Sequence, residues 1–478
     1  HNLQAGKNFI WITIGQIVTR ILGLFFFIVL SFKLGSAGLG AYSFISSFVP
    51  LWFLLIDLGA SHYLYREWVK RKETHQEIEN DFHILLTSKL ILSILIFIFF
   101  STFNYIYNQN IFIPLVIFFI SNIFAQILQL ADVYLMSFNA FKYISFRQII
   151  EKTIITLIGI ISLFIFPSLK IIFIIYLLSQ LIALFYYALA VLPFKFKIIL
   201  NLKRSGYLFK KGLPFMFIIL FASIYAKTDI IMLRYFDNFE VVGWYSTAYK
   251  FIDLVLIFPT LFVSAIFPVI SSLYHTNKAK EKFTNFLYKC IRIIFSTGLI
   301  ASLLLFFYSG LLVAIFFPPD FYPSIYALKI LAISICLTFF NMLFNDVLIL
   351  QNKEKTSLLI TSSCATLNVI LNFILIPRFS LYGAAWASVL CGIINFFLLQ
   401  KHAKWKSNKF LIAKVTLILF LNICVVLIFK HFNILANLYI SSFVVIINIL
   451  LLSWYGLLKK EDIKLFYDPI KMKLTKSN

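Results

Sequence analysis

Long apolar runs joined by short polar connections constrain the fold of this chain more than any other feature. A transmembrane α-helix needs about 20 consecutive, mostly apolar residues. Fourteen stretches meet that length, and they lie at roughly 8–31, 41–64, 84–103, 111–136, 149–167, 170–192, 213–235, 241–270, 289–317, 324–350, 356–376, 382–400, 411–429 and 438–457. Since 61% of the 478 residues are hydrophobic and only 13% are charged, the composition is that of an integral membrane protein.

The runs predict helices rather than strands. Each run is continuously apolar instead of alternating, and a sheet edge exposed to lipid is not tolerated. We therefore expect an all-α integral membrane protein with about fourteen transmembrane helices. The first run is longer than a signal-peptide core and is followed by no small-residue cleavage site, so we expect it to be a retained span.

The distribution of Lys and Arg predicts the topology. If the N-terminus is cytoplasmic, 32 of the 42 basic residues fall in connections on that side, five fall on the other side and five lie within spans. Cytoplasmic connections of membrane proteins carry an excess of Lys and Arg. We expect both termini to be cytoplasmic, and this topology explains the net charge of +23 without a nucleic-acid partner.

The sequence lacks the motifs of the common enzyme classes. It contains no GxxxxGK loop, no HExxH, no GxSxG and no connection long enough to form a catalytic domain. The five Cys and seven His residues do not have metal-ligand spacing. These features predict a transporter, with no catalytic residues, no metal and no cofactor.

A short internal repeat predicts two lobes. Gly40-Ala-Tyr-Ser43 matches Gly243-Trp-Tyr-Ser246 at an offset of 203 residues. Six predicted spans separate the copies, and an even number leaves their orientation unchanged, as in transporters with parallel repeats. We expect an N-lobe of six helices over residues 1–200, a C-lobe of six helices over 201–405, and two further helices with a basic cytoplasmic tail over 406–478.

Charged side chains inside the apolar runs mark the candidate site. A charge at mid-bilayer costs about 2.5–3.5 kcal/mol on insertion scales, so it needs a partner or water. We expect these residues to line a water-filled or substrate-facing cavity, with buried structural ion pairs as the alternative. The candidate cavity residues, which include two glutamines on polar helix faces, are Arg20, Gln16, Lys227, Asp229, Lys250, Asp253 and Gln126.

Spacing separates the charges that can pair from those that cannot. Lys250 and Asp253 are three residues apart and can pair on one helix, whereas Lys227 and Asp229, two apart, cannot face each other. We therefore expect Lys227 and Asp229 to contact other helices or the substrate. Charged residues closer to the ends of runs, such as Lys89 and Asp132, are expected to snorkel or to cap helices.

Three stretches resemble the polysaccharide transporter family. They read LGSAGLGAYSFISSFVPLWFLLIDLGASHYLYRE at 34–67, KTDIIMLRYFDNFEVVGWYSTAYKFID at 227–253 and LNVILNFILIPRFSLYGAAWASV at 367–389. The family comprises O-antigen-type flippases for lipid-linked oligosaccharides, within the multidrug/oligosaccharidyl-lipid/polysaccharide exporter superfamily. The resemblance implies a V-shaped, two-lobed helical fold in a bacterial or archaeal cytoplasmic membrane. It also implies alternating access that moves an undecaprenyl-diphosphate-linked repeat unit from the inner to the outer leaflet.

The resemblance also implies roles for the charged residues. The cations Arg20, Lys227 and Lys250 would meet the diphosphate or acidic sugars. The carboxylates that would balance these cations or couple transport to ions are Asp57, Asp229 and Asp253. The implied partners are the lipid-linked oligosaccharide, membrane lipids, and the polysaccharide polymerase and glycosyltransferases of the same pathway.

Two other functions stay open from the sequence. A cation-coupled multidrug or metabolite antiporter of the same superfamily would use the deep carboxylates to bind cations. A membrane-embedded glycan polymerase or ligase would need a sizeable external loop with catalytic Arg and His, and the external connections here are short. We prefer the flippase, because moving a polar head group across the membrane needs a hydrated cavity and no covalent chemistry.

Overall fold

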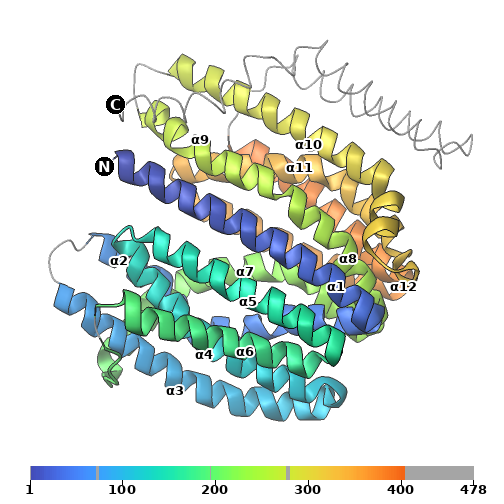
Figure 1. Ribbon diagram of the computed structural model, residues 1–478. Coiled ribbons are helices and arrows are strands. Elements are labelled where there is room, and N and C mark those ends of the chain that lie inside the picture. The colour runs from blue at the N-terminus through green and yellow to red at the C-terminus, as the bar shows by residue number, and fades with distance from the viewer. Residues whose placement is uncertain (1, 71–74, 194, 276–279, 404–478) are drawn as a thin grey trace, which may run out of the picture. The chain divides into compact units, whose positions relative to one another are not determined.

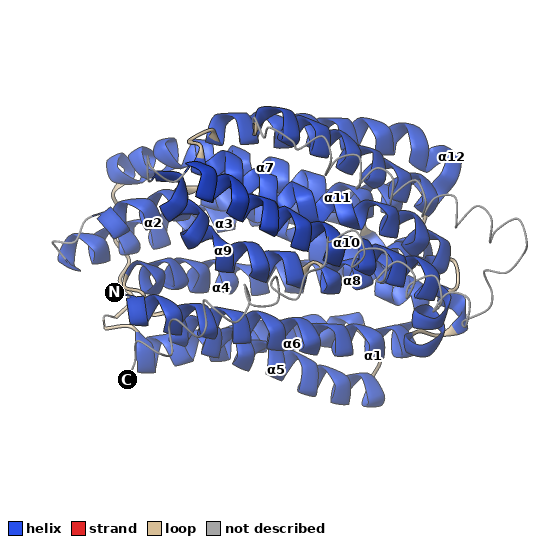
Figure 2. Ribbon diagram, turned by 90° about the horizontal axis from the view of Figure 1, so that it is seen from above, coloured by secondary structure: helices blue, strands red, loops and turns tan. Residues whose placement is uncertain are grey.

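Helices are the only regular elements in the described part of the chain. The structure, a computed structural model, describes residues 2–70, 75–193, 195–275 and 280–403. Every regular element in these ranges is a helix, and Figure 2 shows no strand among them. The predicted all-α fold is confirmed. The predicted spans at 411–429 and 438–457 lie outside the described residues.

The chain divides into two compact units, His1–Ser246 and Thr247–Asn478. The boundary between the units falls inside helix α8 (Phe239–Val255). The division into lobes at residues 200 and 405 stays a prediction.

The first unit consists of long helices lying side by side. Helix α5 packs against α1 and α6, and α4 packs against α6 and α3, as Figure 1 shows. Helix α7 packs against α1 and α2. The elements are α1 (Asn2–Asp57), α2 (Ala60–Lys70), α3 (His75–Tyr107), η1 (Gln109–Ile111), α4 (Phe112–Ser137), α5 (Phe141–Ile165), α6 (Leu169–Tyr186), η2 (Tyr187–Val191), α7 (Leu202–Phe236) and the first half of α8.

Two of the helical elements each contain two predicted spans. In α1 the backbone kinks at Gly35, where φ is 65°, a conformation that glycine adopts without a steric penalty. A second kink, at Ser380 with φ 52°, divides α12 (Glu354–His402). Ten described helices are long and apolar enough to cross a membrane. Since two of them contain a kink between predicted spans, the ten correspond to the first twelve predicted spans, and the chain is a multi-pass membrane protein.

The second unit is built around α11 (Ser324–Leu350), which packs against α9 (Ile257–His275), α10 (Lys280–Phe316) and α12. A short helix, η3 (Pro319–Phe321), precedes α11. Amide side chains connect these helices: Asn341 Nδ2 donates to the Gly392 carbonyl at 3.1 Å. Such bonds fit the role of Asn as a contact between packed membrane helices.

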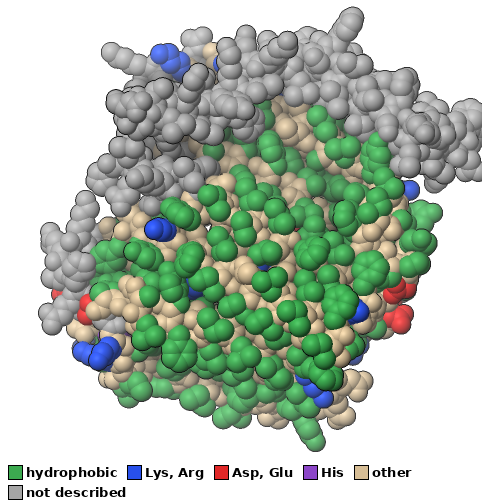
Figure 3. All heavy atoms as spheres, in the orientation of Figure 1, with side chains coloured by type: hydrophobic (Ala, Val, Ile, Leu, Met, Phe, Trp, Pro, Cys, Tyr) green, Lys and Arg blue, Asp and Glu red, His purple; other side chains and the backbone are tan. Residues whose placement is uncertain are grey.

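The outer surface is apolar, as a surface in contact with lipid must be. Figure 3 shows a face on which hydrophobic side chains predominate and charged side chains are sparse. Large apolar side chains such as Phe164, Phe185 and Phe373, each 65% exposed, contribute to the exposed surface of the chain. In water such exposure would be unfavourable, whereas in a bilayer these side chains contact lipid tails.

Candidate functional site

The charged residues predicted on α1 and α7 occupy different environments. Arg20 and Gln16 lie one turn apart on α1, and both are half-buried. On α7, Lys227 is exposed, whereas Asp229 is 3% exposed and accepts a hydrogen bond of 2.5 Å from the Tyr245 hydroxyl of α8. Lys227 and Asp229 therefore lie on opposite sides of α7, in line with their spacing. Lys227 makes no ion pair or hydrogen bond with any residue that the structure describes.

The charges predicted on α8 belong to the second unit. Lys250 is half-buried and Asp253 is exposed, and both lie on the half of α8 that follows Ser246. Their roles as cavity or ion-coupling residues stay a prediction.

A buried network holds Asp57, a predicted ion-coupling residue. Lys89 Nζ, on α3, lies 2.5 Å from Asp57 Oδ1. The same ammonium donates to Ser61 Oγ at 2.8 Å and to Gln126 Oε1 at 3.1 Å, and Ser61 donates in turn to Asp57. The structure thus brings Gln126 and Asp57 together. The expectation that Lys89 snorkels is wrong, because the side chain is 2% exposed and uses its donors inside the protein.

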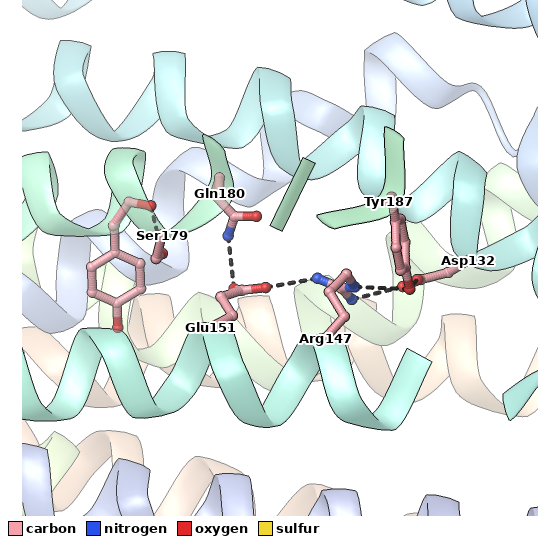
Figure 4. Close-up of polar contacts among 7 residues, drawn as sticks. Asp132, Arg147, Glu151, Ser179, Gln180 and Tyr187 are labelled. Atoms are coloured by element: carbon pink, nitrogen blue, oxygen red, sulfur yellow. Dashed lines mark hydrogen bonds and ion pairs between the residues drawn. The ribbon is translucent and has the colours of Figure 1, made fainter. Parts of the chain in front are cut away.

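A second buried network joins α4, α5, α6 and η2, as Figure 4 shows. Arg147 donates to Asp132 Oδ2 through Nη2 and to Glu151 Oε2 through Nη1, each at 2.7 Å. Its Nε donates to the Tyr187 hydroxyl at 3.2 Å, and that hydroxyl donates to Asp132 Oδ1 at 2.5 Å. Gln180 Nε2 donates to the other oxygen of Glu151 at 2.7 Å. Asp132 is therefore an ion-pair partner and not the cap or snorkelling residue that its position predicted.

The start of α5 explains why the sequence did not reveal this network. The predicted span begins at residue 149, whereas the helix begins at Phe141. Arg147, which precedes the predicted span, thus lies within the helix. The i,i+4 spacing of Arg147 and Glu151 was the available signal, because such pairs are neighbours on a helix face.

Each of the four carboxylates described above in the first unit therefore has a partner within the protein. Asp57 is bound by Lys89, Asp132 and Glu151 are bound by Arg147, and Asp229 accepts from Tyr245. Within the described residues no three His, Cys, Asp or Glu side chains cluster as a metal site would require.

The two copies of the sequence repeat touch each other within the first unit. A Cβ atom added to Gly40 would lie 1.7 Å from the Phe239 carbonyl oxygen, and one added to Gly243 would lie 2.1 Å from the Ser36 carbonyl oxygen. Residues 36 and 239 differ by the same 203 positions as residues 40 and 243, so the contact is reciprocal. Equivalent surfaces that contact each other reciprocally are the mark of two-fold symmetry.

Two family models match the chain. The model described as polysaccharide biosynthesis protein matches residues 5–274, and the MatE model matches residues 214–374. The first match spans more than half of the sequence and contains both networks described above.

Curated relatives match over part of their length. The "Probable low-salt glycan biosynthesis flippase Agl15" of Haloferax volcanii is 28% identical over 192 residues, which is 38% of each chain. The "Probable flippase AglR" of the same organism is 27% identical over 179 residues, or 36% of this chain and 37% of the relative. The chain thus aligns with little more than a third of the length of these relatives.

Solved structures share the fold. The lipid II flippase MurJ in an inward closed conformation has a TM-score of 0.72 at 17% identity, over 91% of this chain and 97% of that one. The MATE multidrug transporter DinF-BH has a TM-score of 0.61 at 17% identity, over 85% and 96%. A multidrug/oligosaccharidyl-lipid/polysaccharide superfamily transporter from Pyrococcus furiosus has a TM-score of 0.57 at 16% identity, over 84% of this chain and 95% of that one. At these identities the likeness establishes the fold alone.

Proposed function

Because the chain belongs to the polysaccharide biosynthesis protein family, we propose that it is a flippase for a lipid-linked glycan. The proposed substrate is an oligosaccharide repeat unit attached to undecaprenyl diphosphate, which moves from the inner to the outer leaflet by alternating access. The flippase names of the archaeal relatives and the fold shared with MurJ support this proposal.

One observation of the structure carries the proposal: the accessible charge in the spans of the first unit is positive. The buried carboxylates Asp57, Asp132 and Glu151 are each bound to an internal cation. By contrast, Lys227 is exposed on an apolar helix and has no ion-pair partner in the described part of the chain. A cation at that depth is stabilised by water or by an anionic ligand. A diphosphate supplies such an anion.

The chemistry required of the protein is modest. A large polar head group needs a hydrated path with cations along it, while the prenyl tail stays in lipid. No bond is made or broken, so the protein acts as a transporter and not as an enzyme. The pathway's glycosyltransferases would supply the lipid-linked unit and a polymerase would consume it.

The proposal is tested with purified protein in vesicles that contain fluorescent undecaprenyl-diphosphate-N-acetylglucosamine. We expect the wild-type protein to move the lipid between leaflets, measured by dithionite quenching. The Arg20→Ala and Lys250→Ala variants should reconstitute normally and lose most of this activity. The Lys142→Ala variant is the control, because Lys142 is exposed near the start of α5. Full activity in both span variants would overturn their assignment.

The MatE match over residues 214–374 favours one second candidate, a cation-coupled antiporter for drugs or metabolites. Such a protein would drive ethidium out of vesicles when a proton or sodium gradient is applied. Gradient-driven efflux of ethidium together with no movement of the undecaprenyl lipid would favour the antiporter over the flippase.

A further inference from the structure

Lys152 lies at mid-span, where a lysine needs a partner. It is near the middle of α5 (Phe141–Ile165), roughly 16 Å along the axis from the first residue at about 1.5 Å per residue. That distance is longer than a lysine side chain, so the Lys152 ammonium group does not reach the N-terminal end of α5.

A glycine on the neighbouring helix makes room for the end of this side chain. Gly23 is buried in α1, and a Cβ atom added there would lie 3.1 Å from Lys152 Cε and 3.5 Å from Nζ. The Lys152 ammonium group therefore lies directly over the backbone of α1. A side chain at residue 23 would press on the lysine.

Lys152 is not held by an ion pair in the part of the chain that the structure describes. The adjacent carboxylate, Glu151, is bound to Arg147 and Gln180. Lys152 itself makes no ion pair and no hydrogen bond to any residue in the described ranges. An ammonium group at this depth costs about 2.5–3.5 kcal/mol unless water or an anion stabilises it.

A second cation shares the same face of α1. Arg20 precedes Gly23 by three residues, a spacing that places the two on one side of a helix. Two cations next to one glycine, Arg20 and Lys152, suit an anion that carries more than one negative charge.

We propose that Lys152, lying over Gly23, binds the diphosphate group of the lipid substrate together with Arg20. This inference rests on the proposed function and extends it, because it names a binding residue that the sequence motifs do not. A lysine provides a compact ammonium group with three donors, which suits phosphate oxygens.

The test measures binding of three lipid probes to the full chain in nanodiscs: undecaprenyl diphosphate, undecaprenyl monophosphate and undecaprenol. We expect Lys152→Gln to weaken binding of the diphosphate about tenfold, to weaken binding of the monophosphate less, and to leave undecaprenol unchanged. Lys152→Arg should retain most of the affinity. The matched control is Lys142→Gln, on the same helix, which should bind all three probes like the wild type.

Chemical restoration of the charge separates a binding role from a structural one. In a chain without other cysteines, Lys152→Cys should bind the diphosphate weakly. Methanethiosulfonate ethylammonium, which adds a positive group, should restore binding, and the negative ethylsulfonate reagent should not. Wild-type affinity in Lys152→Gln would overturn this inference alone. A wild-type protein that binds the diphosphate no better than undecaprenol would overturn the proposed function and this inference together.

Discussion

Arg147 joins three elements of the first unit through one guanidinium group. Its three nitrogens donate separately to Tyr187, Glu151 and Asp132. Two carboxylates face this single cation, so the pairs formed inside the network leave an excess of one negative charge. Breaking a buried ion pair by removing one partner is far more costly than removing the surplus charge, because the remaining ion is left without compensation.

Replacing the cation and replacing one of the two carboxylates should therefore have different effects on stability. We expect Arg147→Met to lower the free energy of unfolding by about 3–5 kcal/mol. Glu151→Gln should change it by less than about 1 kcal/mol, since the new amide still accepts from Arg147 and can donate to Gln180 Oε1, a buried acceptor with no partner in the described structure. Reversible unfolding in mixed micelles, followed by tryptophan fluorescence, measures both values. Equal losses in the two variants would contradict this account.

At the scale of elements, the crossing of α1 and α8 depends on the absence of side chains. The added Cβ atoms at Gly40 and Gly243 would collide with backbone oxygens, which cannot rotate away as a side chain can. Helix axes can approach this closely only when small residues lie at the contact. The reciprocal contact places the same sequence motif on both sides of the crossing.

We predict that Gly40→Ala forces α1 and α8 apart and reduces stability by at least about 2 kcal/mol, the range of overpacked cores. Gly206→Ala is the control, because Gly206 lies within α7 and a Cβ atom there would meet nothing within 4 Å. The control should be stabilised by about 0.5–1 kcal/mol through helix propensity. Thermal unfolding in detergent measures the stability of both variants. A Gly40→Ala protein as stable as the control would refute the close contact.

Run length was sufficient to predict the helices, but it could not locate the polar partners. The first twelve predicted spans correspond to described helices because each backbone must satisfy its own hydrogen bonds in lipid. The start of α5 was placed too late because Arg147 interrupts the apolar pattern, although Asp132 on α4 compensates its charge and Tyr187 accepts a hydrogen bond from it. Lys89 was misjudged for the same reason, since its partner Asp57 lies on another helix. When the partner of a charged side chain lies on another helix, the spacing of residues along one helix cannot reveal the pair.

For the whole molecule, the distribution of basic residues still predicts the orientation. The 32 basic residues counted on the side of the N-terminus include Lys142, Arg147 and Lys152, which lie in α5; without these three, 29 remain on that side, against five on the other side. Such a bias sets the orientation of multi-pass proteins. We therefore expect the connection between α3 and α4 to be external and α2 to be cytoplasmic.

Cysteine labelling in intact cells tests this orientation. Gln109, between α3 and α4, and Arg66, in α2, are both exposed, so each can be replaced by Cys with little structural change. In a chain whose five native cysteines are replaced by Ala, an impermeant maleimide should label Gln109→Cys in intact cells and Arg66→Cys only after permeabilisation. The opposite pattern would invert the topology.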